Sequence, residues 1–307
     1  MRPVCATIRN QKAREVHDMI FHDLMRHPGV FFHVLPDGQP HVHGHFSAAA
    51  HPGRRVIAVC GKGGVGKSAL CALMTHALAH RTDTGRLLVI DADPALGLAL
   101  ALGIEPRHTI AGVRDELLAA ATSGSAQAEQ EIAQKLDYLV FESLIEYEDY
   151  AFLAMGRSRD IGCYCSVNDL LRDAVELLIK DFDCVLIDGE AGLEQINRQV
   201  IAAVDSLICV SDGSARAART VETLWDMAAE NKLVPHHSFF LVFNRQEERA
   251  EPAALRSDVT PHVLGSIPQD PELAAFDKEG RPLTELSHNN PAFKAVNHIL
   301  AHLLEHS

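Results

Sequence analysis

The sequence predicts an α/β protein with a doubly wound, mostly parallel sheet of about seven strands and helices on both faces. From residue 55 onward, short apolar runs alternate with segments of helical spacing. The apolar runs are nearly continuous, as expected for strands that are covered on both faces. A glycine-rich loop separates the first apolar run from the first helical segment. This combination is typical of doubly wound folds.

The expected strands are short runs of Val, Ile, Leu, Phe and Cys. They cover residues 55–60, 86–90, 136–141, 183–188, 206–211, 239–243 and 262–266. Helices are expected between them, at residues 67–80, 168–180, 194–203, 215–230 and 290–305. Residues 120–134 are rich in Ala, Gln, Ser and Glu, which indicates a peripheral helix or loop.

Residues 1–54 are expected to form a histidine-rich extension, and residues 55–307 the main domain. The stretch 12–26 has helical spacing, and residues 30–45 predict two extended runs joined by an Asp-Gly turn. His41, His43 and His45 alternate along the second run, so their imidazoles can share one side of a strand and bind nickel or zinc. A solvated or partner-docking extension is an equal alternative.

Composition excludes several classes of partner and compartment. The net charge is -13, and because residues 1–55 carry seven Lys/Arg and four Asp/Glu, the remainder carries -16. An acidic body argues against nucleic acid and anionic membranes. The seven cysteines lack the spacing of a disulfide scaffold, and no apolar run reaches the length of a membrane span. We therefore expect a cytoplasmic protein.

The glycine-rich loop has the pattern of a phosphate-binding loop. Its residues are Gly61, Lys62, Gly63, Gly64, Val65, Gly66, Lys67 and Ser68. They satisfy G-x-x-x-x-G-K-[ST] between a strand and a helix. Backbone N–H groups would hold phosphates at the helix N-terminus, Lys67 would reach the β- and γ-phosphates, and Ser68 would bind Mg²⁺. A dinucleotide fingerprint also fits the glycines but has no use for Lys67 and Ser68.

Lys62 makes the loop, "GKGGVGKS", resemble that of the MinD/ParA/ArsA/nitrogenase iron protein class of ATPases. The resemblance implies ATP and ADP as ligands and a homodimer in which Lys62 contacts the partner's nucleotide. A solvated loop lysine is the alternative interpretation.

Acidic residues end two of the expected strands. "VIDADP" contains Asp91 and Asp93, and "CVLIDGEAGLE" contains Asp188 followed by Gly189, Glu190 and Gly192. We expect Ser68, Asp91 and Asp188 to bind Mg²⁺. The resemblance implies that Asp93 orients the attacking water and that the segment from Asp188 to Gly192 senses the γ-phosphate. Alternatively, each Asp caps the helix that follows its strand.

The same resemblance implies a base-binding site late in the chain. Asn244 ends the run "FFLVFNRQ", and residues 265–273, "GSIPQDPEL", include Pro268. In the class such residues contact adenine. Arg245 and Gln246 follow Asn244 where a guanine motif would need lysine and aspartate.

Cys163 and Cys165 flank one tyrosine immediately before an expected helix. The positive end of a helix lowers the pKa of a thiol and favours metal ligation. Two thiols do not complete a tetrahedral sulfur site, but two chains related by a two-fold axis supply four. The pair therefore predicts a thiophilic metal, such as zinc, nickel, copper(I) or an iron–sulfur cluster, at a dimer interface. A redox-active pair and simple burial are the alternatives.

Together, "GKGGVGKS", "DADP", "GCYC" and "DGEAGLE" resemble the CooC family, over roughly residues 55–307. The resemblance implies slow, dimerisation-dependent hydrolysis of ATP that assists nickel insertion into carbon monoxide dehydrogenase. It also implies Ni²⁺ or Zn²⁺ at Cys163 and Cys165. The N-terminal extension departs from the family pattern, so another nickel enzyme is a possible client.

Two other functions fit the same class. A positioning switch like MinD or ParA would act on membrane or DNA. However, the C-terminal segment has one lysine and an apolar stripe, as in a packing helix (Phe293, Val296, Leu300, Leu303). An iron–sulfur electron-transfer ATPase would need cysteines further apart than Cys163 and Cys165.

Overall fold

The structure, a computed structural model, describes most of the chain after residue 53. The described residues are 31–34, 40–43, 54–122, 136, 138–157, 171, 174–189, 204–230, 234–247 and 252–306. Of these, 31–34, 40–43, 120–122 and 306 are described by their backbone alone.

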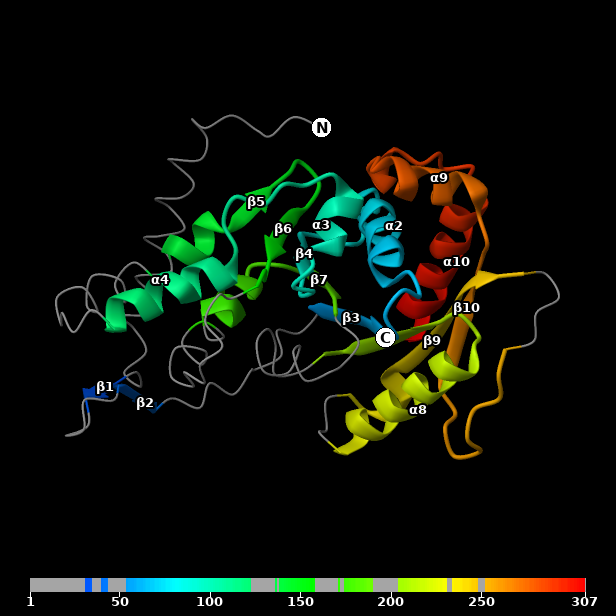
Figure 1. Ribbon diagram of the computed structural model, residues 1–307, viewed down its shortest axis with the longest axis horizontal. Coiled ribbons are helices and arrows are strands. Elements are labelled where there is room, and N and C mark those ends of the chain that lie inside the picture. Colours follow the sequence, from blue (N-terminus) through cyan, green and yellow to red (C-terminus); the bar gives the residue numbers. More distant parts are fainter. Residues whose placement is uncertain are drawn as a thin grey trace.

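An eight-stranded sheet forms the centre of the molecule (Figure 1). The strands are β3 (Arg55–Gly61), β4 (Leu87–Asp91), β5 (Leu144–Glu146), β6 (Ala151–Ala154), β7 (Cys184–Asp188), β8 (Ser206–Ser211), β9 (Phe239–Gln246) and β10 (His262–Pro268). Their order across the sheet is β10-β9-β8-β3-β7-β4-β6-β5. All neighbours pair in parallel except the edge strand β5, which is antiparallel to β6. The predicted fold class is confirmed.

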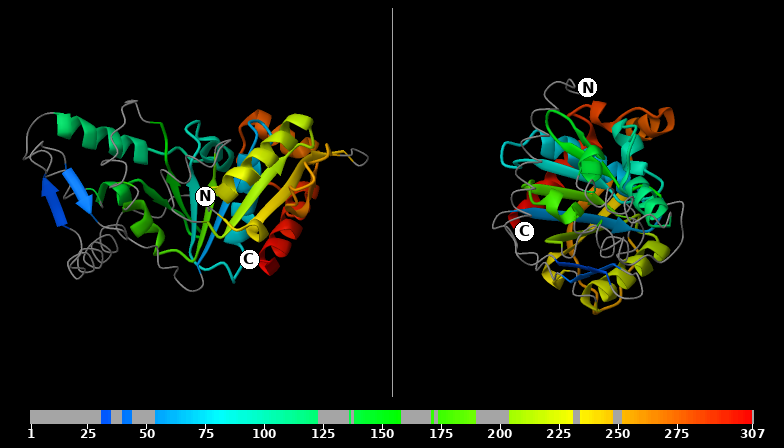
Figure 2. Two further views of the ribbon diagram at one scale, coloured as in Figure 1. Left: turned by 90° about the horizontal axis from the view of Figure 1, so that it is seen from below. Right: turned by 90° about the vertical axis from the view of Figure 1, so that its left-hand side faces the viewer.

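Helices cover both faces of this sheet (Figure 1 and Figure 2). They are α2 (Lys67–Ala79), α3 (Gly97–Leu102), α4 (Ile110–Thr122), α8 (Ala215–Glu230), α9 (Pro271–Glu279) and α10 (Pro291–His306), with short 3₁₀ turns η1 (His236–Ser238) and η2 (Leu283–Glu285). Successive residues of a strand point to opposite faces. Accordingly, Ala58 and Cys60 belong to the apolar core that includes residues of α4 and α8, whereas Ile57 and Val59 belong to the core on the other face, with residues of α2 and α10.

One predicted strand is wrong. Of the predicted strand 136–141, residue 136 and residues 138–141 are helical, and Leu136 and Val140 are both buried. Their spacing of four places both on one face of a helix, and a short apolar run does not distinguish the two structures. The strands β5 and β6 were not predicted, and with them the sheet has eight strands although the predicted strand 136–141 is absent. The helices α3, α4 and α9 were not predicted either.

Most other predicted elements are confirmed within one to three residues. Strand β8 and helix α8 have the predicted bounds. In the predicted helix 168–180, residue 171 and residues 174–179 are helical. The predicted helices 12–26 and 194–203 lie outside the described residues.

The two extended runs predicted in the N-terminal extension are confirmed as β1 (Phe31–Val34) and β2 (Pro40–His43). They pair antiparallel, with residue 33 opposite residue 41 and residue 31 opposite residue 43. The turn between them lies outside the described residues. The division of the chain at residue 54 stays a prediction.

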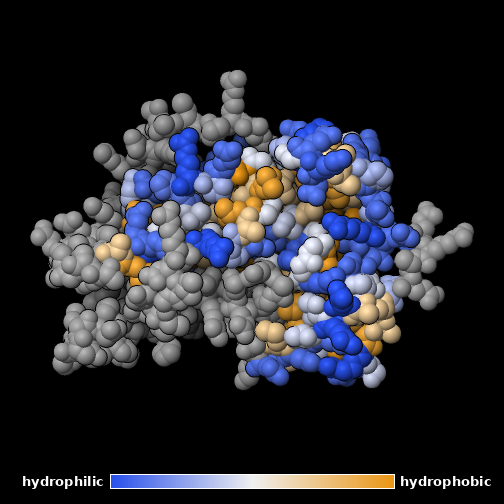
Figure 3. Space-filling view, viewed as in Figure 1, coloured by the Kyte–Doolittle hydropathy of each residue, from blue (hydrophilic) through white to orange (hydrophobic). Residues whose placement is uncertain are grey.

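The face seen in Figure 3 is largely hydrophilic, with an apolar patch over α3. Leu100 of α3 is 69% exposed. Among the described residues, none of the helices combines the length and the apolar character that crossing a membrane requires.

Candidate nucleotide-binding site

The phosphate loop leaves the central strand β3 and enters α2. Gly61 has φ 143°, and a Cβ added to it would lie 2.4 Å from the Val210 carbonyl oxygen on β8, so a side chain does not fit there. By contrast, a Cβ added to Gly63 or Gly64 would meet nothing within 4 Å. The loop is therefore pressed against the sheet at its start and open over its middle, as a phosphate cradle requires.

The N-terminus of α2 is free to bind an anion. The helix begins at Lys67 after Gly66, whose φ of 93° needs glycine. Its first turn carries no acidic residue, and no side chain at the cap position accepts its N–H groups. Lys67 is buried, with 8% of its surface exposed. Unpaired N–H groups and a buried ammonium together make this end of the helix electropositive.

Asp188 supplies the negative charge of the site. It ends β7, in register with Val59 of β3 and Asp91 of β4, and it is fully buried. Neither of its carboxylate oxygens has a hydrogen-bond partner among the described residues. Burial raises the pKa of Asp188 to about 7, while the nearby Ser68 hydroxyl and Lys67 ammonium act in the opposite direction.

A buried carboxylate without a partner is costly unless a cation pairs with it. Oxygen ligands from a carboxylate and a hydroxyl suit Mg²⁺. Asp188 and Ser68 therefore fit the metal that accompanies a nucleotide in phosphate loops.

Asp91 has a different environment. Its Oδ1 accepts a hydrogen bond from the Asp93 N–H (3.1 Å) and its Oδ2 one from the Ala99 N–H (2.9 Å), in the first turn of α3. Burial raises its pKa to about 6, and these N–H groups oppose the rise. This geometry favours the alternative in which a strand-end Asp caps the following helix. The direct contact of Asp91 with Mg²⁺ stays a prediction.

The segment that Asp91 anchors passes close to the phosphate loop. Asp93 is half-buried, and its Oδ1 accepts the Ala95 N–H at 2.8 Å. At Gly97, an added Cβ would lie 2.9 Å from the Ser68 hydroxyl oxygen. The start of α3, four residues after Asp93, thus lies beside the predicted metal ligand Ser68. The role of Asp93 with water stays a prediction.

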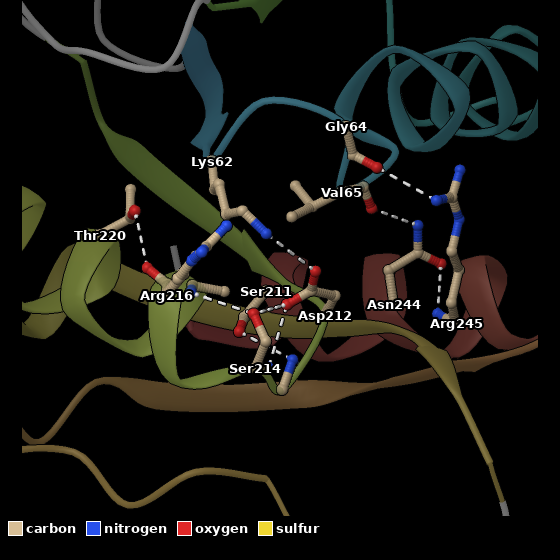
Figure 4. A network of polar contacts seen from close by, with 12 residues as sticks. Lys62, Gly64, Val65, Ser211, Asp212, Ser214, Arg216, Thr220, Asn244 and Arg245 are labelled. Carbon is tan, nitrogen blue, oxygen red and sulfur yellow. Dashed lines mark hydrogen bonds and ion pairs between the residues drawn. The ribbon is translucent and has the colours of Figure 1, made fainter.

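Lys62 contacts its own chain. Its Nζ lies 3.3 Å from Oδ2 of Asp212, which follows β8 (Figure 4). The other carboxylate oxygen of Asp212 accepts hydrogen bonds from the backbone and hydroxyl of Ser214, and the Ser214 hydroxyl accepts the Ala217 N–H of α8. Asp212 was not predicted as a site residue, although an Asp directly after an apolar strand and two residues before a Ser is a signal that the sequence shows.

The predicted base-binding residues come together at the ends of β9 and β10. Pro268 pairs in register with Gln246, two residues after Asn244. Asn244 is buried, and its Nδ2 donates to the Val65 carbonyl of the phosphate loop at 2.8 Å. Arg245 donates from Nη1 to the Gly64 carbonyl at 3.1 Å and was not predicted. The structure therefore joins the predicted base site to the phosphate loop.

The predicted metal sites for nickel or zinc fall outside what the structure describes. Cys163, Cys165, Glu190, Gly192 and His45 lie outside the described residues, and His41 and His43 are described by backbone only. Within the described part of the chain, no group of three or more His, Cys, Asp or Glu is arranged to hold a metal. The described cysteines, Cys60, Cys71, Cys184 and Cys209, are free and buried, which agrees with their interpretation as small apolar residues.

These features define a class. The fold is a doubly wound sheet with a phosphate loop after its central strand. The site contains a buried Lys67 and a buried Asp188 without a hydrogen-bond partner among the described residues. Together they are typical of an ATP-binding P-loop protein. A family model described as an AAA domain matches residues 54–235, and the chain belongs to this family of P-loop ATPases.

Relatives agree with this assignment. The chain is 37% identical over 249 residues to an uncharacterized ATP-binding protein of Methanocaldococcus jannaschii, which covers 80% of this chain and 96% of the relative. It is 30% identical over 273 residues to the carbon monoxide dehydrogenase accessory protein CooC of Rhodospirillum rubrum, covering 81% and 96%.

Solved structures share the fold. The MinC:MinD cell division protein complex of Aquifex aeolicus aligns with a TM-score of 0.60 at 21% identity, over 82% of this chain and 97% of that chain. A ParA family ATPase of Chlorobium tepidum aligns with a TM-score of 0.59 at 15% identity, over 82% and 99%. At such identities the likeness concerns the fold alone.

Proposed function

We propose that this protein is an ATP-dependent metallochaperone that delivers nickel to a nickel enzyme such as carbon monoxide dehydrogenase. The observation that carries the proposal is the similarity to CooC over 96% of that protein's length. The nucleotide site supports the ATP-dependent part, because its phosphate cradle, buried lysine and unpaired carboxylate fit a magnesium nucleotide.

The described residues divide the work of hydrolysis among them. The phosphate-loop N–H groups and Lys67 hold the phosphates, Ser68 and Asp188 hold the metal, and Asp93 orients the attacking water. When bound, Mg²⁺ neutralises charge on the transferred phosphoryl group. Lys62 of each protomer completes the site of the other, so hydrolysis depends on dimerisation and is slow.

Metal delivery follows from the same dimer. Cys163 and Cys165 of two protomers supply four thiolates around one nickel or zinc ion, which is the cargo. The segment from Asp188 through Gly189 and Gly192 responds to the γ-phosphate and changes the separation of the thiolates. Hydrolysis then releases the metal to the client in the cytoplasm. The histidine-rich extension, with His41, His43 and His45, holds metal before transfer.

The C-terminal helix bears on the membrane-positioning alternative. Phe293, Val296, Leu300 and Leu303 of α10 are each at most 2% exposed and pack with the core. An apolar stripe buried in this way is not available to enter a bilayer. This supports the metallochaperone over a switch that uses α10 as a membrane anchor.

The first test measures native mass and metal content of anaerobically purified protein with ATP. The wild type is compared with the Cys163→Ala/Cys165→Ala double variant. One nickel or zinc per wild-type dimer and none per variant dimer is the expected result. Metal-free dimers of both proteins would point to the positioning switch instead, and a brown protein that contains sulfide would point to the electron-transfer ATPase.

A control variant separates the nucleotide from the metal. Lys67→Ala removes the ammonium that contacts the phosphates, so ATP hydrolysis should be lost while metal binding by the cysteines in the absence of ATP is retained. Loss of hydrolysis together with an unchanged circular dichroism spectrum assigns the effect to the site.

A further inference from the structure

Two consecutive residues at the end of β9 bond two consecutive carbonyls of the phosphate loop. The Asn244 side chain donates to the Val65 carbonyl at 2.8 Å, and the Arg245 guanidinium donates to the Gly64 carbonyl at 3.1 Å (Figure 4). The two bonded residues are 179 positions apart in the first contact and 181 positions apart in the second.

Arg245 has an unusual backbone conformation that serves both contacts. Its φ is 57°, in the left-handed region that residues with a Cβ rarely adopt. In this conformation the Arg245 N–H donates to Oδ1 of Asn244 at 2.9 Å, which leaves the Asn244 amide nitrogen aimed at the loop. Strained conformations of this kind persist only where surrounding contacts hold them.

The same turn is tied to the end of β10. Gln246 donates from Nε2 to the Asn244 carbonyl at 3.0 Å, and the Gln269 N–H donates to the Gln246 carbonyl at 3.2 Å. The residues that hold the phosphate loop therefore belong to the unit that carries the predicted base-contacting segment.

Holding a carbonyl orients the N–H group of the same peptide unit. A peptide unit is planar and trans, so its C=O and N–H point in opposite directions. Fixing the carbonyls of Gly64 and Val65 therefore directs the N–H groups of Val65 and Gly66 the other way. The Val65 N–H otherwise makes only a long contact, 3.4 Å, with the Lys62 carbonyl. These two N–H groups belong to the part of the loop that cradles phosphates.

We propose that Arg245 is a positioning residue of the nucleotide site, which with Asn244 holds the phosphate loop in its binding conformation before nucleotide arrives. A loop that is already ordered loses less conformational entropy when ligand binds. The contribution of Arg245 is therefore the same for every ligand that uses the phosphate cradle, whether or not the ligand carries a base. The inference concerns nucleotide binding and does not depend on the delivery of nickel.

The test compares ligands with and without adenosine. In Arg245→Gly the guanidinium is removed, while glycine adopts the left-handed φ without strain. Dissociation constants for Mg-ADP and for Mg-pyrophosphate are measured by displacement of a fluorescent ADP analogue. We expect both constants to rise by the same factor, about two- to fivefold, because Arg245 is exposed and solvent screens its charged hydrogen bond. Arg107→Gly, which removes an exposed arginine from another loop, should change neither constant.

A rise for Mg-ADP alone would overturn the proposal and assign Arg245 to the base, and no rise for either ligand would also overturn it. Hydrogen exchange of ligand-free protein gives a second, local readout. Amides of residues 61–68 should exchange faster in Arg245→Gly than in wild type, while amides of the central strands β7 and β8 exchange at unchanged rates. Equal exchange of the loop in both proteins would contradict a positioning role.

Discussion

At the scale of one residue, Asp188 lowers the stability of the ligand-free protein at the position where we expect Mg²⁺ to bind. Its carboxyl group is fully buried and lacks a hydrogen-bond partner among the described residues. The pKa in the folded protein, about 7, lies above the ordinary value of 3.8. The folded state therefore keeps a proton that the unfolded state has lost between these values, and stability falls as pH rises from about 4 to 7.

Asp188→Asn should therefore stabilise the protein without ligand. Because each pKa unit corresponds to about 1.4 kcal/mol, the free energy of unfolding at pH 8 should rise by up to a few kcal/mol. The difference should shrink as pH is lowered toward 4. Urea unfolding across this pH range checks the expectation, and the variant should lose Mg²⁺-dependent hydrolysis. A variant less stable than wild type at pH 8 would contradict it.

Asp91→Asn is the matched comparison, because Asp91 is also a buried acid at a strand end. Its two oxygens accept backbone N–H groups, and an amide nitrogen in place of one oxygen faces a donor instead. This variant should lose about 1–3 kcal/mol of stability, the cost of an unsatisfied buried group.

At the scale of elements, the turn between β8 and α8 holds Lys62 in an ion pair. Asp212 pairs with Lys62 and also accepts hydrogen bonds from Ser214 at the cap of α8. Both charged side chains are about one-third exposed, so the pair contributes little to stability, about 0.5 kcal/mol. In the dimer proposed above, Lys62 would have to leave Asp212 before contacting the nucleotide of the partner protomer.

Asp212→Asn should make dimerisation easier. The amide keeps an oxygen for Ser214 but removes the charge that holds Lys62, so the dimer fraction at a given ATP concentration should rise about two- to fivefold, in line with about 0.5–1 kcal/mol. Sedimentation velocity with ATP measures this fraction. Asp226→Asn, which removes an exposed Asp of α8 paired with Arg256 instead, serves as the control. An unchanged dimer fraction in Asp212→Asn would show that the pair does not restrain Lys62.

At the scale of the whole molecule, α2 and α10 enclose a cluster of imidazoles. The ring of His76 lies 4.8 Å from that of His80, 4.9 Å from His288 and 4.9 Å from Phe293. The Nε2 atom of His76 is buried and has no partner among the described residues. Burial first, and then the neighbouring His80 and His288, lower the pKa of His76 from 6.5 to about 4.

This cluster predicts sensitivity to acid. The folded state keeps His76 neutral, whereas the unfolded state binds a proton below pH 6.5, so stability is fully present above that pH and is lost as pH falls toward 4. The loss should be on the order of 2 kcal/mol after allowance for solvent screening. Urea unfolding at pH 7 and pH 5 measures it. His76→Leu should reduce the difference between the two pH values, whereas His237→Leu, at an exposed position, should not. Equal pH dependence in all three proteins would remove His76 as the cause.

The sequence was sufficient to predict those parts of the site whose residues are close together along the chain. The phosphate loop, its strand and its helix are contiguous, so residues 55–79 could be placed from glycine pattern and apolar periodicity alone. The parallel sheet followed from the alternation of strands and helices, because each helix returns the chain to the edge of the sheet at which the next strand begins. The sequence also indicated that Asp91 and Asp188 each end a strand, and the structure places them in register on neighbouring strands.

The tertiary structure alone decided which groups are satisfied and which are free. The sequence does not distinguish Asp91 from Asp188. Only the folded structure shows that Asp91 accepts N–H groups from Asp93 and from Ala99 of α3, while Asp188 has no hydrogen-bond partner among the described residues. The contacts of Lys62 with Asp212 and of Arg245 with Gly64 link residues 150 and 181 positions apart. The periodicity of apolar residues shows only which face of a single element is buried. A hydrogen bond between two elements also requires a defined distance between them, and that distance is set only when the sheet has assembled.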